Sequence, residues 1–143
     1  MEYQNQMELS FSAISENESF ARSVIACFAL KLKPSVAQVS DLKTAVSEAV
    51  TNAIVHAYPE KVGTILMKAY IDGGCLHINI VDSGVGIDDV NLALEPFYTS
   101  KPDEERSGMG FTIMKSFMDE VKVVSKKGEG TTVYMIKNIK GDV

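Results

Sequence analysis

Between Ser40 and Pro59 the sequence carries a helical pattern with two contrasting faces. We expect this helix to begin near Ser40 or Asp41 and to close at Pro59, because serine and aspartate cap helix starts and proline cannot continue a helix. Its apolar face has to be covered by other elements, so it constrains the whole fold. That face is formed by Leu42, Ala45, Val46, Ala49, Val50, Ala53 and Ile54.

Alternation of apolar and polar residues predicts strands on both sides of this helix. Gly73 and Gly74 accept the positive φ angles of a tight turn, so they predict a hairpin between two of these strands. The expected strands are residues 7–13, 64–71, 76–81, 121–125 and 131–136.

Two further helical patterns complete the expected elements. The first spans residues 20–32 behind Ser15 and Glu18, which have the form of a capping box, and the second follows Gly110. Helices and antiparallel strands are interspersed without repeats or linkers. The pattern therefore predicts an α+β two-layer sandwich, in which one sheet carries helices on one face.

Composition limits the classes of function. The 143 residues are 45% hydrophobic and carry 14 basic against 19 acidic side chains, for a net charge of −5. An acidic chain is poorly suited to grip a phosphate backbone, and no apolar run approaches the ~20 residues that span a bilayer. We expect a soluble, intracellular protein of the cytoplasm that binds neither nucleic acid nor membranes, with Cys27 and Cys75 as small core residues.

A polar stripe opposes the apolar face of the long helix. Thr44, Glu48, Asn52 and His56 are spaced by four residues, so a helix presents them together. Glu48 can take a proton from a hydroxyl, and the Asn52 carbonyl oxygen is a hard neutral ligand of the kind that Mg²⁺ accepts. A solvated helix face shows the same pattern, so the stripe alone leaves both interpretations open.

The segment DSGVGI follows an expected strand. The Asp82 carboxylate could accept a hydrogen bond from the exocyclic amino group of a base, and Gly84 and Gly86 could let a flat ligand approach the backbone. An ordinary turn has the same composition, so this segment too leaves two interpretations open.

The segment RSGMGF precedes the last helical pattern. Gly108 and Gly110 free the backbone so that successive N–H groups can point at an anion, and Arg106 adds a cation. The preceding polar loop offers Thr99 and Lys101 as phosphate contacts. A surface loop before a helix is the alternative for both segments.

These three motifs, in this order and spacing, resemble the GHKL superfamily of ATPases and kinases. Within it the chain is similar, from about Phe11 to its end, to the sporulation branch of the anti-sigma-factor serine kinases, through SEAVTNAIVHAY, DSGVGI, FYTSKP and ERSGMGFTIMKSFMDEV. The resemblance implies a Bergerat fold with a mixed, mostly antiparallel sheet. No phosphoacceptor or transducer pattern flanks it, so we expect residues 1–143 to form a single kinase domain.

The resemblance also implies roles for the motif residues. Glu48 would be the catalytic base, Asn52 the magnesium ligand, and His56 a neighbour of the phosphates. Asp82 would hold the adenine amino group. The adenine pocket would also use Gly84, Gly86 and Thr131.

The lid, the phosphate cradle and the partner surface are implied in the same way. The lid and cradle would comprise Thr99, Lys101, Arg106, Ser107, Gly108, Met109, Gly110 and Phe111. Arg22 would contact the protein partners. Without the resemblance, its position in the sequence suggests a solvated arginine.

The implied function is that of a homodimeric anti-sigma factor that uses ATP (or ADP) and Mg²⁺. It would bind and inhibit a sporulation sigma factor and phosphorylate a serine of the anti-anti-sigma factor. A general-stress anti-sigma kinase shares these motifs. A nucleotide-dependent binder without phosphotransfer and an ATPase that uses water are further alternatives, although Glu48 favours a kinase.

Overall fold

The computed structural model describes residues 5–59, 61–87 and 110–140. The strands are β1 (Asn5–Ser12), β2 (Thr64–Asp72), β3 (Cys75–Asp82), β4 (Glu120–Lys126) and β5 (Gly130–Asn138). The helices are α1 (Glu16–Ala29), α2 (Val36–Asn52) and α4 (Gly110–Phe117). A 3₁₀ turn (Leu30–Leu32) follows α1, and a π-helical segment (Ala53–Ala57) continues α2.

The five strands form one sheet in the order β1-β2-β3-β5-β4, and every pair is antiparallel. Gly73 and Gly74 have φ angles of 58° and 82°, which confirms the hairpin between β2 and β3. The register places Asp82, at the end of β3, opposite Thr131 of β5. Residues almost fifty positions apart are thus neighbours.

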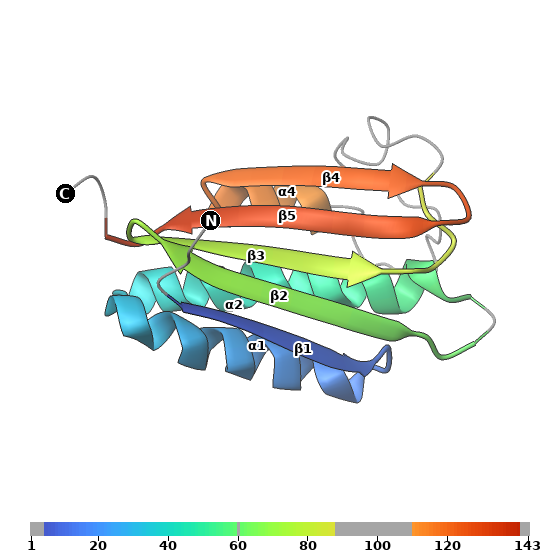
Figure 1. Cartoon of the computed structure of the whole chain (residues 1–143), viewed down its shortest axis with the longest axis horizontal. Helices are drawn as coiled ribbons and strands as arrows, with labels where there is room; N and C mark the ends of the chain where they lie inside the picture. The colour runs from blue at the N-terminus through green and yellow to red at the C-terminus, as the bar shows by residue number, and fades with distance from the viewer. Residues whose placement is uncertain (1–4, 60, 88–109, 141–143) are drawn as a thin grey trace.

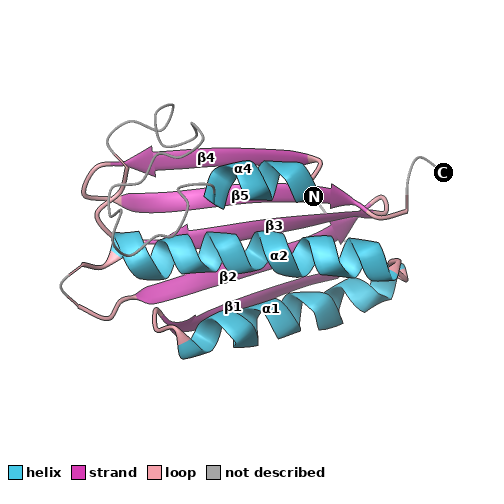
Figure 2. Ribbon diagram, turned by 180° about the vertical axis from the view of Figure 1, so that it is seen from behind, coloured by secondary structure: helices cyan, strands magenta, loops and turns pink. Residues whose placement is uncertain are grey.

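The three α-helices of the described residues cover one face of the sheet, which confirms the expected two-layer sandwich (Figures 1 and 2). Helix α2 lies between α1 and α4 (Figure 2). Its predicted apolar face is buried except for the half-buried Ile54, and it shares one core with the inward residues of β2 and β3. The largest fully buried side chains among these are Leu42, Val46, Val50, Ile65, Met67, Leu76, Ile78 and Ile80.

Helix α2 begins earlier than the sequence pattern predicted. Ser35 is its N-cap: the Ser35 hydroxyl accepts from Gln38 N–H at 3.1 Å, and Gln38 Oε1 accepts from Ser35 N–H at 2.9 Å. This reciprocal capping box satisfies two backbone donors, so the helix begins there. The predicted start near Ser40 or Asp41 is therefore wrong by about one turn.

The predicted capping box at Ser15 and Glu18 is wrong. Ser15 has helical dihedral angles (φ −55°, ψ −34°) and its side chain makes no capping hydrogen bond. Glu18 instead accepts a hydrogen bond from Ser47 of α2. Its side chain therefore links two helices rather than closing the first turn of its own.

The cysteines depart from the expected core positions. Cys27 lies on the outer side of α1 and is exposed, and Cys75 is half-buried. The helical period placed Ala21, Ile25 and Ala29 inward, which leaves position 27 on the solvent side. No helix in the described part of the chain has the length and apolar character needed to cross a bilayer.

Candidate functional site

The polar stripe lies on the C-terminal half of α2 and on the π-helical segment. Thr44, Glu48 and Asn52 are on α2, and His56 follows in the π turn; all four side chains are half-buried. The Thr44 hydroxyl donates to the Ser40 carbonyl at 3.0 Å, so it is engaged by its own helix. Glu48 and Asn52 are one turn apart, and they place a carboxylate and an amide on the same helix face.

Asn52 meets the first residue of α4. A Cβ atom built on Gly110 would lie 2.8 Å from Asn52 Nδ2, which is closer than real Cβ atoms come, and 3.1 Å from Asn52 Oδ1, which is tighter than most Cβ contacts. The side-chain amide therefore occupies the space that a side chain at position 110 would need. Two of the three sequence motifs are in direct contact here.

Asp82 ends β3 as a half-buried carboxylate. Its Oδ1 accepts hydrogen bonds from Gly84 N–H at 3.0 Å and from Thr131 N–H at 3.2 Å. Burial raises the pKa of Asp82 above the ordinary value of 3.8, because the charged form loses hydration, while the two N–H donors partly oppose this. Both hydrogen bonds fall on Oδ1, which holds the orientation of the carboxylate.

The glycines that follow Asp82 are needed for close packing of the protein itself. A Cβ on Gly84 would lie 2.1 Å from the Ala57 carbonyl oxygen, and Val85 N–H donates to that oxygen at 2.9 Å. Gly86 has a φ of +76° and a Cβ there would lie 2.2 Å from the Lys126 carbonyl oxygen. The segment is thus held between the end of the long helix and the β4–β5 turn. Whether it also faces a ligand stays a prediction.

Ser125 was not among the predicted site residues, but it organises this region. Its hydroxyl group accepts from Ile87 N–H at 2.8 Å, donates its proton to the Gly130 carbonyl at 3.1 Å, and forms a hydrogen bond with the Thr131 hydroxyl at 2.7 Å. A signal was present in the sequence: Ser125 is the polar member of an inward series whose other members, Val121 and Val123, are apolar.

Tyr58 and Gly130 were also missed. The Tyr58 hydroxyl donates to the Thr64 carbonyl at 2.7 Å and accepts from Ser83 N–H at 2.8 Å. A Cβ on Gly130, whose φ is +103°, would lie 2.1 Å from the Asp82 carbonyl oxygen. Both residues fix the backbone around Asp82 through contacts with residues 82 and 83, which are distant in sequence, so no local pattern could reveal them.

The predicted lid and cradle fall largely outside the described residues. This holds for Thr99, Lys101, Arg106, Ser107, Gly108 and Met109. Gly110 and Phe111 begin α4, where Gly110 is buried and Phe111 packs against the core. The described part of this motif therefore contributes the start of a helix that abuts Asn52.

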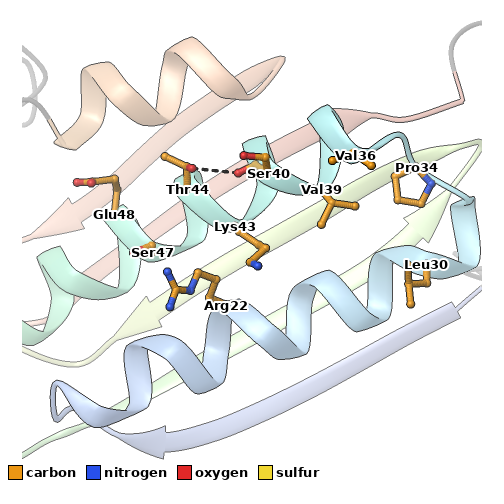
Figure 3. A pocket seen from close by; sticks show the side chains of 10 residues that line it. All are labelled: Arg22, Leu30, Pro34, Val36, Val39, Ser40, Lys43, Thr44, Ser47 and Glu48. Atoms are coloured by element: carbon orange, nitrogen blue, oxygen red, sulfur yellow. Dashed lines mark hydrogen bonds between the residues drawn. The ribbon is translucent and has the colours of Figure 1, made fainter.

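A groove of about 590 Å³ runs along the outer surface between α1 and α2 (Figure 3). Glu48 stands near one end, and an apolar group lies toward the other; Arg22 and Lys43 lie between them. Arg22 Nε is 3.7 Å from Glu18 Oε1, the same oxygen that accepts from Ser47. The apolar group consists of Leu30, Pro34, Val36 and Val39.

The donor set at Asn52 fits a magnesium ion that is shared with phosphates. Within residues 5–59, 61–87 and 110–140, no three His, Cys, Asp or Glu side chains gather into a metal cluster. Mg²⁺ commonly takes only one or two protein oxygen ligands and completes its shell with phosphate oxygens and water. The Asn52 amide oxygen can supply one such ligand, and it lies on the same helix face as the Glu48 carboxylate.

The chain is similar in sequence to a known domain family and to known proteins. Residues 11–137 match the model of the histidine kinase-like ATPase domain. The chain is 52% identical over 142 residues to the anti-sigma F factor of Thermoanaerobacter sp. (strain X514), covering 99% of both chains. It is 54% identical over 134 residues to the anti-sigma F factor of Clostridium acetobutylicum, covering 94% of each.

Two solved structures share the fold. The RsbU and RsbW domains of Rv1364c from Mycobacterium tuberculosis align with a TM-score of 0.68 at 17% identity, over 95% of this chain and 32% of that one. Full-length ShkA in complex with AMPPNP aligns with a TM-score of 0.59 at 18% identity, over 87% of this chain and 29% of that one. The chain thus spans about a third of each of these larger proteins.

Proposed function

The chain belongs to the anti-sigma F factors, which carry a histidine kinase-like ATPase domain, and we propose that it is an ATP-dependent serine kinase as well as a binding protein. It would bind and inhibit a sporulation sigma factor in the cytoplasm and phosphorylate an anti-anti-sigma factor on serine. One observation carries the proposal: Glu48 lies one turn from Asn52 and also lines the groove that contains Arg22. A proton acceptor therefore stands between the expected nucleotide side and the expected partner side.

The proposed nucleotide site extends from α2 to the end of β3. Asp82 would accept the adenine amino group, with Gly84, Gly86 and Thr131 around the ring. His56 would lie near the phosphates, and Asn52 would contribute its oxygen to the magnesium ion that accompanies ATP or ADP. The lid and cradle would be Thr99, Lys101, Arg106, Ser107, Gly108, Met109, Gly110 and Phe111. The clamped backbone around Asp82 supports this assignment, because a preorganised acceptor binds without further ordering cost.

In the proposed transfer, Glu48 takes the proton of the substrate serine while the serine oxygen forms a bond to the γ-phosphorus. The bond from that phosphorus to the β–γ bridging oxygen breaks, and ADP leaves with the electron pair. Bound Mg²⁺ would supply charge neutralisation at the phosphates. The half-exposed position of Glu48 on the groove wall lets a serine from another protein reach it.

The partner surface is proposed to be the groove between α1 and α2. Arg22 pairs with Glu18, which also accepts a hydrogen bond from Ser47, so its guanidinium lies beside the contact between α1 and α2. Arg22 and Lys43 favour an acidic contact, and the apolar group at the other end favours an apolar one. The sigma factor and the anti-anti-sigma factor would compete for this surface, so binding of one would require release of the other. We also propose that two copies of this chain form a homodimer.

Incubation with ATP that carries a radioactive γ-phosphate, with and without the serine-bearing partner, tests the proposed function. Transfer of label to the partner supports the kinase. Release of free phosphate without labelled protein would instead indicate an ATPase, and neither product would indicate a nucleotide-dependent binder. Parallel assays with sporulation and general-stress partners distinguish the two kinds of anti-sigma kinase.

A further inference from the structure

Gly110 is the buried first residue of α4, and its neighbour is the far end of the Asn52 side chain. A methyl group at position 110 would lie 2.8 Å from Asn52 Nδ2, 3.1 Å from Oδ1 and 3.4 Å from Cγ. Gly110 is absent from the described glycines with positive φ, so its backbone is open to any residue. The need for glycine here arises from the Asn52 amide and not from the backbone conformation.

We propose that Gly110 is a positioning residue: the absence of its side chain leaves the Asn52 amide in the orientation that presents its oxygen to nucleotide-bound Mg²⁺. The expected effect on Mg²⁺-dependent nucleotide binding rests on the proposed function. The contact between Gly110 and the Asn52 side chain does not depend on it. Gly110 would thereby act through Asn52, in addition to any backbone contact with phosphate.

The amide, rather than the helix, would move if a methyl group were added. Helix α4 is anchored at its other end, where Lys137 Nζ donates to the Phe117 carbonyl at 2.6 Å and to Asp41 Oδ2 at 3.1 Å. Met114 of α4 is fully buried against the core. A side-chain amide at the end of two rotatable bonds can turn at much lower cost than a packed helix can shift.

The first test needs no ligand. In ¹⁵N-labelled protein, the Asn52 side-chain NH₂ signal is identified by its loss in Asn52→Ala. We expect Gly110→Ala to move this signal strongly, while the control Ser116→Ala, on the exposed side of the same helix, leaves it in place. An unmoved signal in Gly110→Ala would overturn the inference whether or not the protein binds ATP.

The second test measures nucleotide affinity with Mg²⁺ and with a chelator. For Gly110→Ala we expect a loss of about 10-fold or more in the Mg²⁺-dependent affinity, as for other residues that orient a metal ligand, and little change without Mg²⁺. Equal losses in both conditions would overturn the role through Asn52. In an Asn52→Ala background the Gly110→Ala substitution should have no further effect on affinity, because the amide that it displaces is absent.

Thermal unfolding distinguishes a displaced Asn52 amide from a destabilised fold. Alanine is favoured over glycine within a helix, so Gly110→Ala should unfold at the wild-type temperature or above. A clear drop would show that the helix has moved instead of the amide, and would overturn the inference. A wild-type protein without Mg²⁺-dependent binding would count against the proposed function, while the NMR signal would still decide the positioning role.

Discussion

The Asp82 carboxylate combines a structural cost with a proposed binding role. Because burial raises the pKa of Asp82 above 3.8, the folded state keeps this proton to a higher pH than the unfolded state does. Its contribution to stability therefore falls as the pH rises from 3.8 through the raised pKa, and above that pKa the ionised group lowers stability. A group that lowers the stability of the ligand-free protein at neutral pH is a candidate for a ligand contact.

Asp82→Asn should separate these two effects. The amide oxygen can still accept from Gly84 N–H and Thr131 N–H, so the melting temperature at pH 7 should equal or exceed that of the wild type. Its NH₂ group would oppose the adenine amino donor, and we expect ATP affinity to fall about 10- to 100-fold, the loss of one hydrogen bond to a charged acceptor.

Unfolding curves from pH 4 to 8 and calorimetric titration with ATP measure both effects of Asp82→Asn. Asp72→Asn, at the exposed hairpin end of β2, is the matched control and should alter neither property. Unchanged ATP affinity in Asp82→Asn would remove this residue from the adenine site.

Glu48→Gln should abolish phosphotransfer while nucleotide still binds. Glutamine keeps the size of the half-buried side chain but cannot take a proton, and general-base catalysis contributes about 10²- to 10⁴-fold. Single-turnover transfer of label to the partner and calorimetric binding of ATP give the two readouts. Glu120→Gln, on the exposed side of β4, should leave both at wild-type values, and transfer at the wild-type rate in Glu48→Gln would exclude Glu48 as the base.

At the scale of the elements, the start of α2 gives the clearest prediction. Ser35→Ala removes the side-chain half of the capping box and should cost about 1 kcal/mol, which lowers the melting temperature by about 3 °C. Ser15→Ala is its control, because Ser15 stands before α1 but makes no capping hydrogen bond. Equal losses in the two variants would show that serine matters there for a reason other than capping.

The elements also show what periodicity can predict. The apolar face of α2 and the alternation of β2 and β3 were recognisable, because burial on one side of an element imposes a fixed spacing on the sequence. The start of α2 was misplaced because apolar spacing is insensitive to the residues before the first turn, where Ser35 and Gln38 decide the boundary.

The candidate site was only partly predictable for a different reason. The roles of Asp82 and Asn52 were suggested by residue type, but the packing requirement at Gly84 depends on the Ala57 carbonyl and that at Gly110 depends on the Asn52 amide. Such contacts join segments that are distant in sequence. They follow from the assembled fold and leave no spacing from which to predict them.

On the scale of the whole molecule, the candidate site lies at one end of the sandwich, and an anchor formed by the contacts of Lys137 lies at the other. The end of α2, the end of β3 and the start of β5 meet at one end of the sandwich (Figure 1). At the other end, Lys137 connects the last part of β5 to Asp41 of α2 and to the end of α4. Motifs far apart in sequence converge because one sheet and one central helix run the length of the protein.

Lys137→Met tests this anchor. The Lys137 side chain is only 13% exposed and Asp41 is 30% exposed, so the substitution leaves a partly buried carboxylate and a helix carbonyl without their donor. We expect a loss of about 1–3 kcal/mol in unfolding free energy, measured by urea denaturation. Lys122→Met, on the exposed side of β4, should change it by less than about 0.5 kcal/mol. Because Asp41→Asn removes the charge that Lys137→Met leaves unpaired, the double variant should lose less than the sum of the single variants; additive losses would show that the two side chains stabilise the fold independently.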